Sequence, residues 1–376
     1  MDKTIFEVTN DLLESGLRGV PVGYCNTSFI DKDKGLFYKS ISIRTLSTWE
    51  PEKVIFLLLE GREGTAEEIR SFKKNLFKRG SCSQAVVKQI YALPRNANPM
   101  ELLSAALIIL GMVESSNNYE EDCFNLIAKI PHLAACVINH HAGWGNTPHV
   151  DNNLGYMENL AHIIKYPKAE IDRFSEVINM FNILHFDHGG GNLSTFTAKV
   201  IASSLSGMHG AVSGAMCALS GARHGKANRD FIEMISNFLD DCKGSISKNS
   251  VHIFVSKILA HKSKIPGFGH SVLSSEDTRA TILYEFAEKN FPENPFVKSA
   301  LLFRKEVPEI LKSSTSIKNP FPNIDAISGA LLHASGFCFP QYYTVLFGLS
   351  RMVGICIQVL YERTKANNGR GTPIIR

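Results

Sequence analysis

Residues 342–360, YYTVLFGLSRMVGICIQVL, carry the longest helical pattern of the chain and decide its fold class. Apolar side chains recur there every three or four residues, which places them on one face of an α-helix. The residues of this face are Tyr342, Leu346, Leu349, Val353, Cys356 and Leu360. Shorter patterns of the same kind cover residues 231–242 and 282–287. Because few segments alternate apolar and polar residues, the sequence predicts a mostly α-helical fold.

The segment from Val20 to Ile43 departs from this helical pattern. It is rich in glycine, β-branched and aromatic residues, and residues 31–35, DKDKG, have the composition of a turn. We therefore expect a small β-hairpin there. Farther along, residues 65–68, TAEE, have the spacing of a capping box, and Pro99 suits the first turn of a helix that runs through Met112.

Two zones rich in glycine and proline, residues 221–225 and 319–329, bracket the middle of the chain. A length of 376 residues is enough for about two domains. We therefore expect a small helical domain of residues 223–333, inserted in a larger domain made of residues 1–222 and 334–376. Hinges at the two zones would let the small domain close over a ligand.

Composition and charge exclude several classes of protein. A hydrophobic content of 44% and a charged content of 20% fit a soluble globular protein. The net charge of +4 is mild, and no stripe of lysine and arginine suggests a nucleic-acid partner. The eight cysteines include no Cys-x-x-Cys pair, which argues against zinc ribbons and redox motifs.

The first residues, Met1–Thr4, have neither the apolar region of a signal peptide nor the arginines of a transit peptide. The apolar stretch from Leu102 to Val113 is too short to span a membrane, and we find no other of transmembrane length. From these observations we expect a cytoplasmic protein without a membrane partner.

Residues 185–192, HFDHGGGN, separate two predicted helices. Free backbone N–H groups at a helix start favour an anion, so this segment suggests a carboxylate-binding loop with His188 as a donor. Ser194 and Thr195 are candidates for capping the following helix. Two other interpretations stay open, a zinc site without a clear further ligand and a glycine-rich turn with a hydrogen-bonded histidine.

Two further histidines lie on turns, His224 in residues 223–225 and His270 in residues 266–270. Asp325 follows the sequence NPFPNI, where an aspartate is ordinarily a helix N-cap. Each motif alone is more often an ordinary structural feature. Together, two histidines and an aspartate can remove a weakly acidic proton, hold the resulting enol and polarise a second carbonyl group.

In this order and at these separations, the motifs resemble the citrate synthase family. The resemblance begins at residues 16–20, GLRGV, and ends at residues 342–351. It implies an all-α, citrate-synthase-like two-domain multihelical fold with a small N-terminal β-hairpin. It also implies a homodimer that condenses acetyl-CoA with oxaloacetate and hydrolyses the citryl thioester. Neither a metal nor a tightly bound cofactor is implied, since acetyl-CoA is a co-substrate.

The resemblance also assigns roles to residues. Asp325 matches the base that removes the acetyl proton, His224 the donor to the enol oxygen, and His270 the donor to the ketone of oxaloacetate. The residues that match oxaloacetate ligands are His188, Asn192, Arg279, Arg351 and, reaching into the neighbouring subunit's site, Arg376. The residues that match the CoA site are Ile265, Pro266, Gly267, Phe268 and Gly269, with Lys318 as a candidate for the phosphates.

Some positions depart from the family pattern. Ala222 and Arg223 stand where Pro-Leu is common, and Gly189 stands where Glu is often found. A cation at residue 223 is expected to lower the pKa of His224 and so favour its neutral form. The alternatives are a 2-methylcitrate synthase that uses propionyl-CoA, a non-catalytic acyl-CoA-binding relative, and a histidine metalloenzyme. A thiol-release assay distinguishes the first two, and a chelator tests the third.

Overall fold

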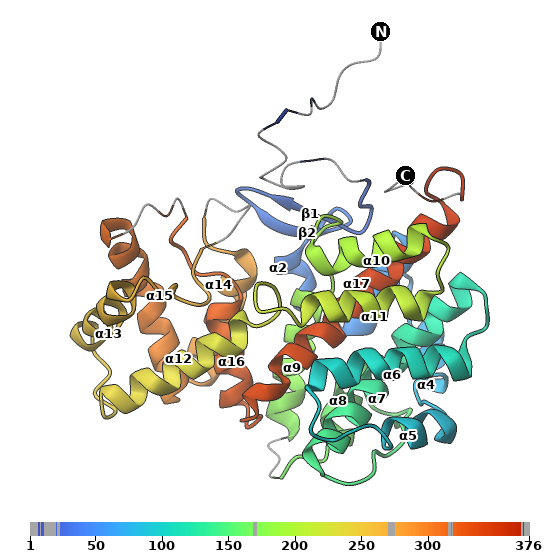
Figure 1. Cartoon of the computed structure of the whole chain (residues 1–376), viewed down its shortest axis with the longest axis horizontal. Coiled ribbons are helices and arrows are strands. Elements are labelled where there is room, and N and C mark those ends of the chain that lie inside the picture. Colours follow the sequence, from blue (N-terminus) through green and yellow to red (C-terminus); the bar gives the residue numbers. More distant parts are fainter. Residues whose placement is uncertain are drawn as a thin grey trace.

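The structure is a computed structural model that describes residues 7, 9–10, 20, 23–167, 171–269, 275–314, 317, 319–369 and 371. Helices dominate this part of the chain, and its strands form one small sheet near the N-terminus (Figure 1). The helices gather in two groups, one on each side of the molecule as Figure 1 shows it. The prediction of an all-α fold with a small sheet is therefore confirmed.

The sheet contains the predicted hairpin. β1 (Ser28–Asp31) pairs antiparallel with β2 (Gly35–Tyr38), and Asp31 lies opposite Gly35. Oδ1 of Asp31 accepts hydrogen bonds from the backbone N–H groups of Asp33 and Lys34, which closes the turn. A short third strand, β3 (Ile41–Ser42), pairs with β2 and was not predicted.

The larger helical group contains the N-terminal helices and the last helix of the chain. Its members are α2 (Ile43–Leu46), α3 (Pro51–Glu60), α4 (Ala66–Lys78), α5 (Gln84–Ile90), α6 (Pro99–Glu114), α7 (Tyr119–Ala142), α8 (Tyr156–Ile163), α9 (Ile171–His185), α10 (Leu193–Ser203), α11 (Met208–Leu219), the 3₁₀-helix η1 (Pro340–Tyr342) and α17 (Tyr343–Thr364). The predicted capping box begins α4, where Thr65 and Glu68 exchange hydrogen bonds with each other's backbone N–H groups. Pro99 is the first residue of α6, as predicted.

Helix α17 is the core of this group. It packs against α7, α9, α10 and α11, and nearly all its side chains are buried. Within the described residues, η1 and α17 together are long and apolar enough to cross a membrane, contrary to the expectation from the sequence. Because 89% of the apolar window is buried inside the protein, α17 has the surroundings of a core helix. Its apolar residues on every side reflect burial among other helices.

A glycine brings α17 against the end of α9. The backbone N–H of Gly354 donates to the carbonyl oxygen of Phe186 over 3.1 Å. A Cβ atom at residue 354 would lie 2.3 Å from that oxygen and 2.7 Å from Cβ of Asp187. Only glycine permits this approach, which places Arg351, one turn earlier in α17, beside the segment that follows α9.

The smaller helical group contains α12 (Ala227–Asp241), α13 (Lys248–Ala260), α14 (Thr278–Asn290), α15 (Pro295–Ser314) and α16 (Asp325–Ala334). Its core includes the ring of Phe303, which contacts the rings of Phe231 and Phe238 edge to face. These helices span residues 227–334, close to the range 223–333 of the predicted small domain, and the domain boundaries stay a prediction. Its movement relative to the larger group stays a prediction.

Candidate active site

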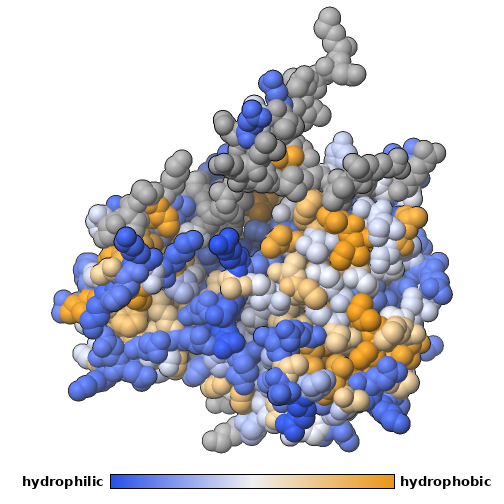
Figure 2. Space-filling model, in the orientation of Figure 1, coloured by the Kyte–Doolittle hydropathy of each residue, from blue (hydrophilic) through white to orange (hydrophobic). Residues whose placement is uncertain are grey.

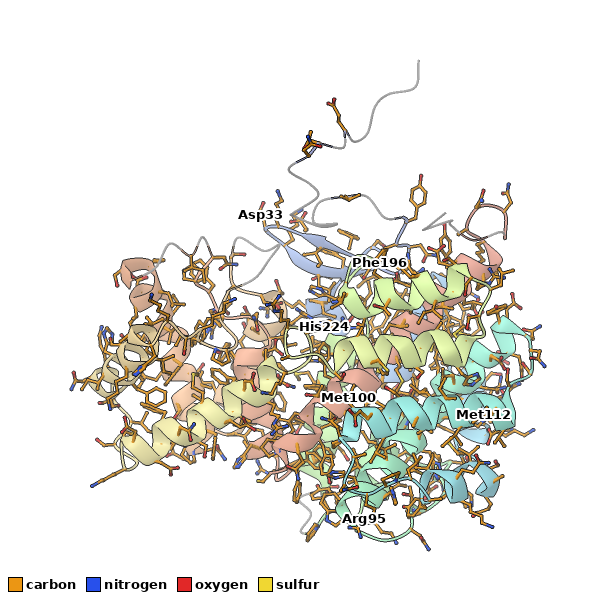
Figure 3. All side chains as sticks on the ribbon, viewed as in Figure 1. Asp33, Arg95, Met100, Met112, Phe196 and His224 are labelled. Atoms are coloured by element: carbon orange, nitrogen blue, oxygen red, sulfur yellow. The ribbon has the colours of Figure 1, made fainter. Side chains whose placement is uncertain are left out.

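A cavity of about 310 Å³ lies where the two helical groups meet. Its lining residues are His185, His188, Asn192, Arg223, His224, Ala227, Gly269, Arg279, Asn323, Ile324, Asp325, Phe347 and Arg351. All the described residues that the sequence assigned to catalysis or oxaloacetate binding are thus brought together from both groups. Figure 3 shows His224 between the two groups. A larger cavity of about 470 Å³, between α4 and α17, contains none of the predicted site residues.

His224 lies on the turn between α11 and α12, and its surroundings define which ring nitrogen carries the proton. The backbone N–H of Ser194 faces Nε2 of His224 at 3.3 Å, and Oγ of Ser194 lies 3.0 Å from the same atom. The hydroxyl group of Ser194 in turn donates to Oδ1 of Asn192 over 2.9 Å. Because the backbone N–H can only donate, Nε2 acts as acceptor and the neutral ring carries its proton on Nδ1.

The neutral form of His224 is strongly favoured. Burial, and next the positive charge of Arg351, lower the pKa of His224 to about 4. Arg223 is not among the causes of this shift, although the sequence led us to expect that it would be. At neutral pH the ring therefore offers one N–H donor without a positive charge.

Asp325 is the first residue of α16 and lines the same cavity as His224. Ile324 occupies the N-cap position, so Asp325 is not the cap that its sequence context suggests. Its backbone N–H donates to Oδ1 of Asn323, while Nδ2 of Asn323 donates to the carbonyl oxygen of Gly269. Burial raises the pKa of Asp325 to about 6, against the opposing effect of Arg279. A carboxylate with a raised pKa is a stronger base than an exposed one.

Two buried arginines give the cavity its positive charge. Arg279, which is 4% exposed, forms a bidentate ion pair with Asp277, at 2.7 Å and 3.1 Å. Arg351, which is 1% exposed, donates from Nε to the carbonyl oxygen of His185, while its Nη1 is buried without a hydrogen-bond partner. A buried guanidinium with an unsatisfied donor is costly unless an anion binds it. This donor indicates where an anionic ligand is expected.

The loop that carries His188 is fixed by the carboxylate of Asp187. Asp187 accepts hydrogen bonds from Thr27, from Oγ of Ser28 at 2.9 Å and from Nε2 of Gln358 at 2.8 Å. Oδ1 of Asp187 also accepts from the backbone N–H of His188 at 2.9 Å. The N-terminal sheet and α17 therefore hold this loop from two sides.

Residues 265–269, assigned to CoA by the resemblance, are attached to the segment that precedes Asp325. The N–H of Gly269 donates to Phe321 O, and the N–H of Asn323 donates to Gly267 O over 2.8 Å. Gly267 and Gly269 have φ angles of 76° and 93°, which side-chain-bearing residues rarely adopt. Within this loop Gly269 lines the cavity, whereas Ile265, Pro266 and Phe268 do not, and CoA binding by the loop stays a prediction.

Three predicted site residues, His270, Lys318 and Arg376, lie outside the described residues. Conversely, sequence reasoning did not assign His185, Asp187 or Asp277 to the site. Nδ1 of His185 donates to the carbonyl oxygen of Phe181 over 2.7 Å, and burial holds the pKa of His185 well below its usual value. His185 is therefore neutral, with its backbone oxygen occupied by Arg351. In the described part of the chain, no cluster of His, Cys, Asp or Glu could hold a metal ion.

Known proteins resemble this chain in sequence and in fold. The sequence model of the family described as citrate synthase, C-terminal domain, matches residues 16–376. Citrate synthase 4, mitochondrial, from Arabidopsis thaliana is 32% identical over 380 residues, which cover 95% of this chain and 80% of the relative. The crystal structure of citrate synthase from Pyrobaculum aerophilum superimposes with a TM-score of 0.82 at 27% identity, covering 96% of this chain and 90% of that one.

A third comparison concerns the fold. The citrate synthase of Thermoplasma acidophilum, described as a ternary complex with carboxymethyl coenzyme A and oxaloacetate, has a TM-score of 0.83 at 24% identity. It covers 96% of this chain and 94% of that one. At this identity the likeness supports the shared fold.

The relatives also correct one prediction. The curated citrate synthases from Arabidopsis thaliana, Citrus maxima and Daucus carota that resemble this chain are all named mitochondrial. The prediction of a cytoplasmic location is therefore wrong. That prediction depended on the absence of a recognisable targeting pattern in residues 1–4. The absence of a pattern in so few residues says little about the location of a protein.

The same comparisons test two further predictions from the sequence. The predicted fold class and the predicted enzyme class, an acyltransferase of the citrate synthase type, are both confirmed by the match over nearly the whole chain. The chain belongs to the citrate synthase family.

Proposed function

We propose that the cavity condenses acetyl-CoA with oxaloacetate and then hydrolyses the citryl thioester to citrate and CoA. The observation that carries this proposal is the pairing of a basic Asp325 with a neutral His224 in one cavity that also holds two buried arginines. Each of these groups has a function in such a reaction, and no other described cavity combines them.

Proton removal is the difficult step. The α-proton of a thioester is about ten pKa units less acidic than an aspartic acid, a difference of roughly 14 kcal/mol. A positioned base contributes about 10²–10⁴-fold in rate, so the base alone does not overcome this barrier. The Nδ1–H of His224 would donate to the enol oxygen as it forms, and a preorganised donor is worth about 3–4 kcal/mol.

The second substrate requires positive charge. Oxaloacetate is a dianion, and guanidinium groups bind carboxylates through two parallel hydrogen bonds. We infer that Arg351 and Arg279 bind its carboxylates, with His188 and Asn192 on the same loop as further ligands. The free Nη1 of Arg351 supports this assignment. The predicted role of His270, donation to the ketone oxygen, belongs to the same proposal.

We also infer a homodimer whose interface includes α6. Ile108, Met112 and Val113 are exposed on this helix, and Met112 is 70% exposed. Figure 2 shows hydrophobic surface over this region, and Figure 3 shows Met112 at the outer end of α6. Covering this surface with a second copy would remove apolar area from water. In that dimer Arg376 would enter the neighbouring site, as the family resemblance implies.

The dimer has a direct test. Sedimentation velocity is expected to give the mass of two chains for the wild type and a larger monomer fraction for Met112→Lys. Lys88→Glu, a charge change on another helix, serves as a control. A monomeric wild type at micromolar concentration would contradict the dimer.

The remaining proposals concern closure and location. Residues 223–333 would close over the bound substrates and protect the citryl thioester from early hydrolysis. Small-angle scattering with and without oxaloacetate measures that closure. A mitochondrial location is proposed from the names of the relatives, and cell fractionation tests it.

The reaction itself is tested by thiol release. CoA release is measured with acetyl-CoA and with propionyl-CoA, each in the presence of oxaloacetate. The same two acyl-CoA esters are then tested with other keto acids. One methylene group in a pocket changes selectivity by about 1–3 kcal/mol, so kcat/KM for both acyl groups must be measured. A higher value for propionyl-CoA would make the chain a 2-methylcitrate synthase. No CoA release with any pair would support the non-catalytic alternative.

A further inference from the structure

Arg223 is a positively charged residue of the cavity lining. It lies on the turn between α11 and α12, next to His224. The turn is closed by hydrogen bonds from His224 N to Gly221 O, at 2.9 Å, and from Gly225 N to Leu219 O, at 3.0 Å. The side chain lines the cavity and is exposed to solvent. Across the described residues, no hydrogen bond or ion pair is formed by its guanidinium group.

The neighbouring cations of the same segment are already paired. Nζ of Lys226 lies 3.0 Å from Asp230, and Nε of Arg229 lies 2.7 Å from Glu233, each one helical turn away. Arg223 has no such partner. It is therefore the cation in this segment that is available to a ligand.

Its position also differs from that of the other two cavity arginines. Arg279 and Arg351 are buried and held by Asp277 and by the carbonyl oxygen of His185. Arg223 is exposed, and its charge does not contribute to the low pKa of the His224 ring. Arg223 therefore belongs to the solvent-exposed part of the cavity lining, whereas Arg279 and Arg351 belong to its buried part.

We propose that Arg223 binds the phosphate groups of the acyl-CoA substrate and so determines how strongly the enzyme prefers a full CoA ester to a shorter thioester. This inference rests on the proposed function. The acyl end of that substrate occupies the cavity, and the rest of it must leave past the rim. A guanidinium group forms bidentate, charge-assisted hydrogen bonds with phosphate oxygens. An exposed arginine keeps its charge at every relevant pH, so this contact persists throughout the working range.

The experiment compares Arg223→Leu with wild type on two substrates. Acetyl-CoA carries phosphates, and S-acetylpantetheine carries none. The ratio of KM values, variant over wild type, is expected to be about ten for acetyl-CoA and close to one for S-acetylpantetheine. Arg229→Leu removes a nearby cation that does not line the cavity, and its ratio for acetyl-CoA is expected to be close to one.

Two further measurements sharpen the test. The KM of the wild type for acetyl-CoA is expected to rise with ionic strength more steeply than that of Arg223→Leu, because salt screens an exposed charge contact. Calorimetric titration gives the dissociation constants of CoA and of pantetheine for the wild type and for Arg223→Leu. These constants make the same comparison without catalytic turnover. If the wild type released no CoA but Arg223→Leu still weakened CoA binding alone, the proposed reaction would fail and the role of Arg223 would stand.

Three results would overturn the inference. One is an unchanged KM and dissociation constant for CoA compounds in Arg223→Leu. Another is an equal rise in the KM for S-acetylpantetheine, which would mean that the side chain contacts the acyl or pantetheine part of the substrate. The third is a raised KM for oxaloacetate with an unchanged KM for acetyl-CoA, which would place the guanidinium on the dianion.

Discussion

The backbone N–H of Ser194 points at Nε2 of His224 from 3.3 Å, so the proton of the neutral imidazole resides on Nδ1. The first turn of α10, a helix of the other helical group, therefore determines which ring nitrogen of His224 carries the proton. The side-chain amide of asparagine places its nitrogen near the position of Nδ1, whereas that of glutamine places it near Nε2.

We accordingly expect His224→Asn to retain more activity than His224→Gln. Both variants should lower kcat by at least about 10²-fold, the value of a lost oxyanion-type donor. The measurement is kcat with acetyl-CoA and oxaloacetate, with circular dichroism as the check on folding. Ser194→Ala keeps the backbone N–H and is expected to lower kcat less than threefold. Equal activity of the Asn and Gln variants would contradict the Nδ1 assignment.

Asp325 predicts a pH dependence. The base must be deprotonated, and its pKa is raised to about 6. The kcat/KM for acetyl-CoA is therefore expected to fall as the pH drops through about 6, and Asp325→Asn is expected to lower kcat by about 10²–10⁴-fold. A profile that is flat between pH 5 and pH 8 would exclude Asp325 as the base.

The same raised pKa has a consequence for stability. The unfolded carboxyl group loses its proton near pH 4 and the folded one near pH 6, so folding becomes less favourable as the pH rises between these values. Asp325→Asn is therefore expected to be more stable than wild type above pH 6 and nearly equal to it below pH 4. Urea unfolding at pH 4 and pH 7.5 measures both differences. A destabilised variant at pH 7.5 would show that the carboxylate is stabilising.

Arg351 predicts a loss of oxaloacetate binding. Arg351→Lys keeps a positive charge but loses the planar fork, and we expect the KM for oxaloacetate to rise by about 10–100-fold, since charged hydrogen bonds are worth about 1.5–3 kcal/mol. Oxaloacetate should raise the Tm of the wild type and have little effect on that of the variant. Arg44→Lys, on a surface pair with Glu285, is the matched control. An unchanged KM for oxaloacetate would remove Arg351 from the binding site.

Asp277 predicts a large effect on folding. Asn can still cap α14, as Asp277 does through the N–H of Arg279, but it removes the carboxylate that forms the ion pair with the buried guanidinium. Asp277→Asn is therefore expected to destabilise the protein by about 3–5 kcal/mol. Glu285→Gln, which breaks an exposed pair, should cost at most about 1 kcal/mol. Denaturant unfolding measures the free energy of unfolding of both variants. Equal destabilisation of Asp277→Asn and Glu285→Gln would contradict the argument.

Much of the fold follows from local sequence. The periodic pattern of residues 342–360 predicted α17, the Thr65 capping box predicted the start of α4, and the turn at residues 31–35 predicted the hairpin. These features depend on neighbours within a few residues, where propensity and capping act. The short strand β3 was missed because two residues carry too little pattern.

The site was predicted less completely. His188, Asn192, His224, Arg279, Asp325 and Arg351 do meet in one cavity, an expectation that came from the order of several motifs. Asp187 was missed because its partners Thr27 and Gln358 are 160 and 171 residues away in the chain. No local pattern records such contacts.

One local prediction was wrong for an identifiable reason. Ser194 was expected to cap α10, but Asn192 occupies the N-cap position and the hydroxyl group of Ser194 donates to it. Oγ of Ser194 also lies 3.0 Å from Nε2 of His224, on a turn outside α10, and a pattern within one helix cannot reveal such a contact.

Because Gly354 has no side chain, the core helix α17 lies in direct contact with the segment that follows α9. The position of α17 therefore determines the position of Arg351 in the cavity. A single added methyl group at residue 354 would wedge α17 away from residues 186–187 and carry the guanidinium of Arg351 outward with it. A drift of one ångström in a catalytic group can cost about 10²-fold in rate. If heating loosens the contact between α17 and residues 186–187, the enzyme should lose activity before it unfolds. The temperature of half-inactivation is therefore expected to lie below the Tm.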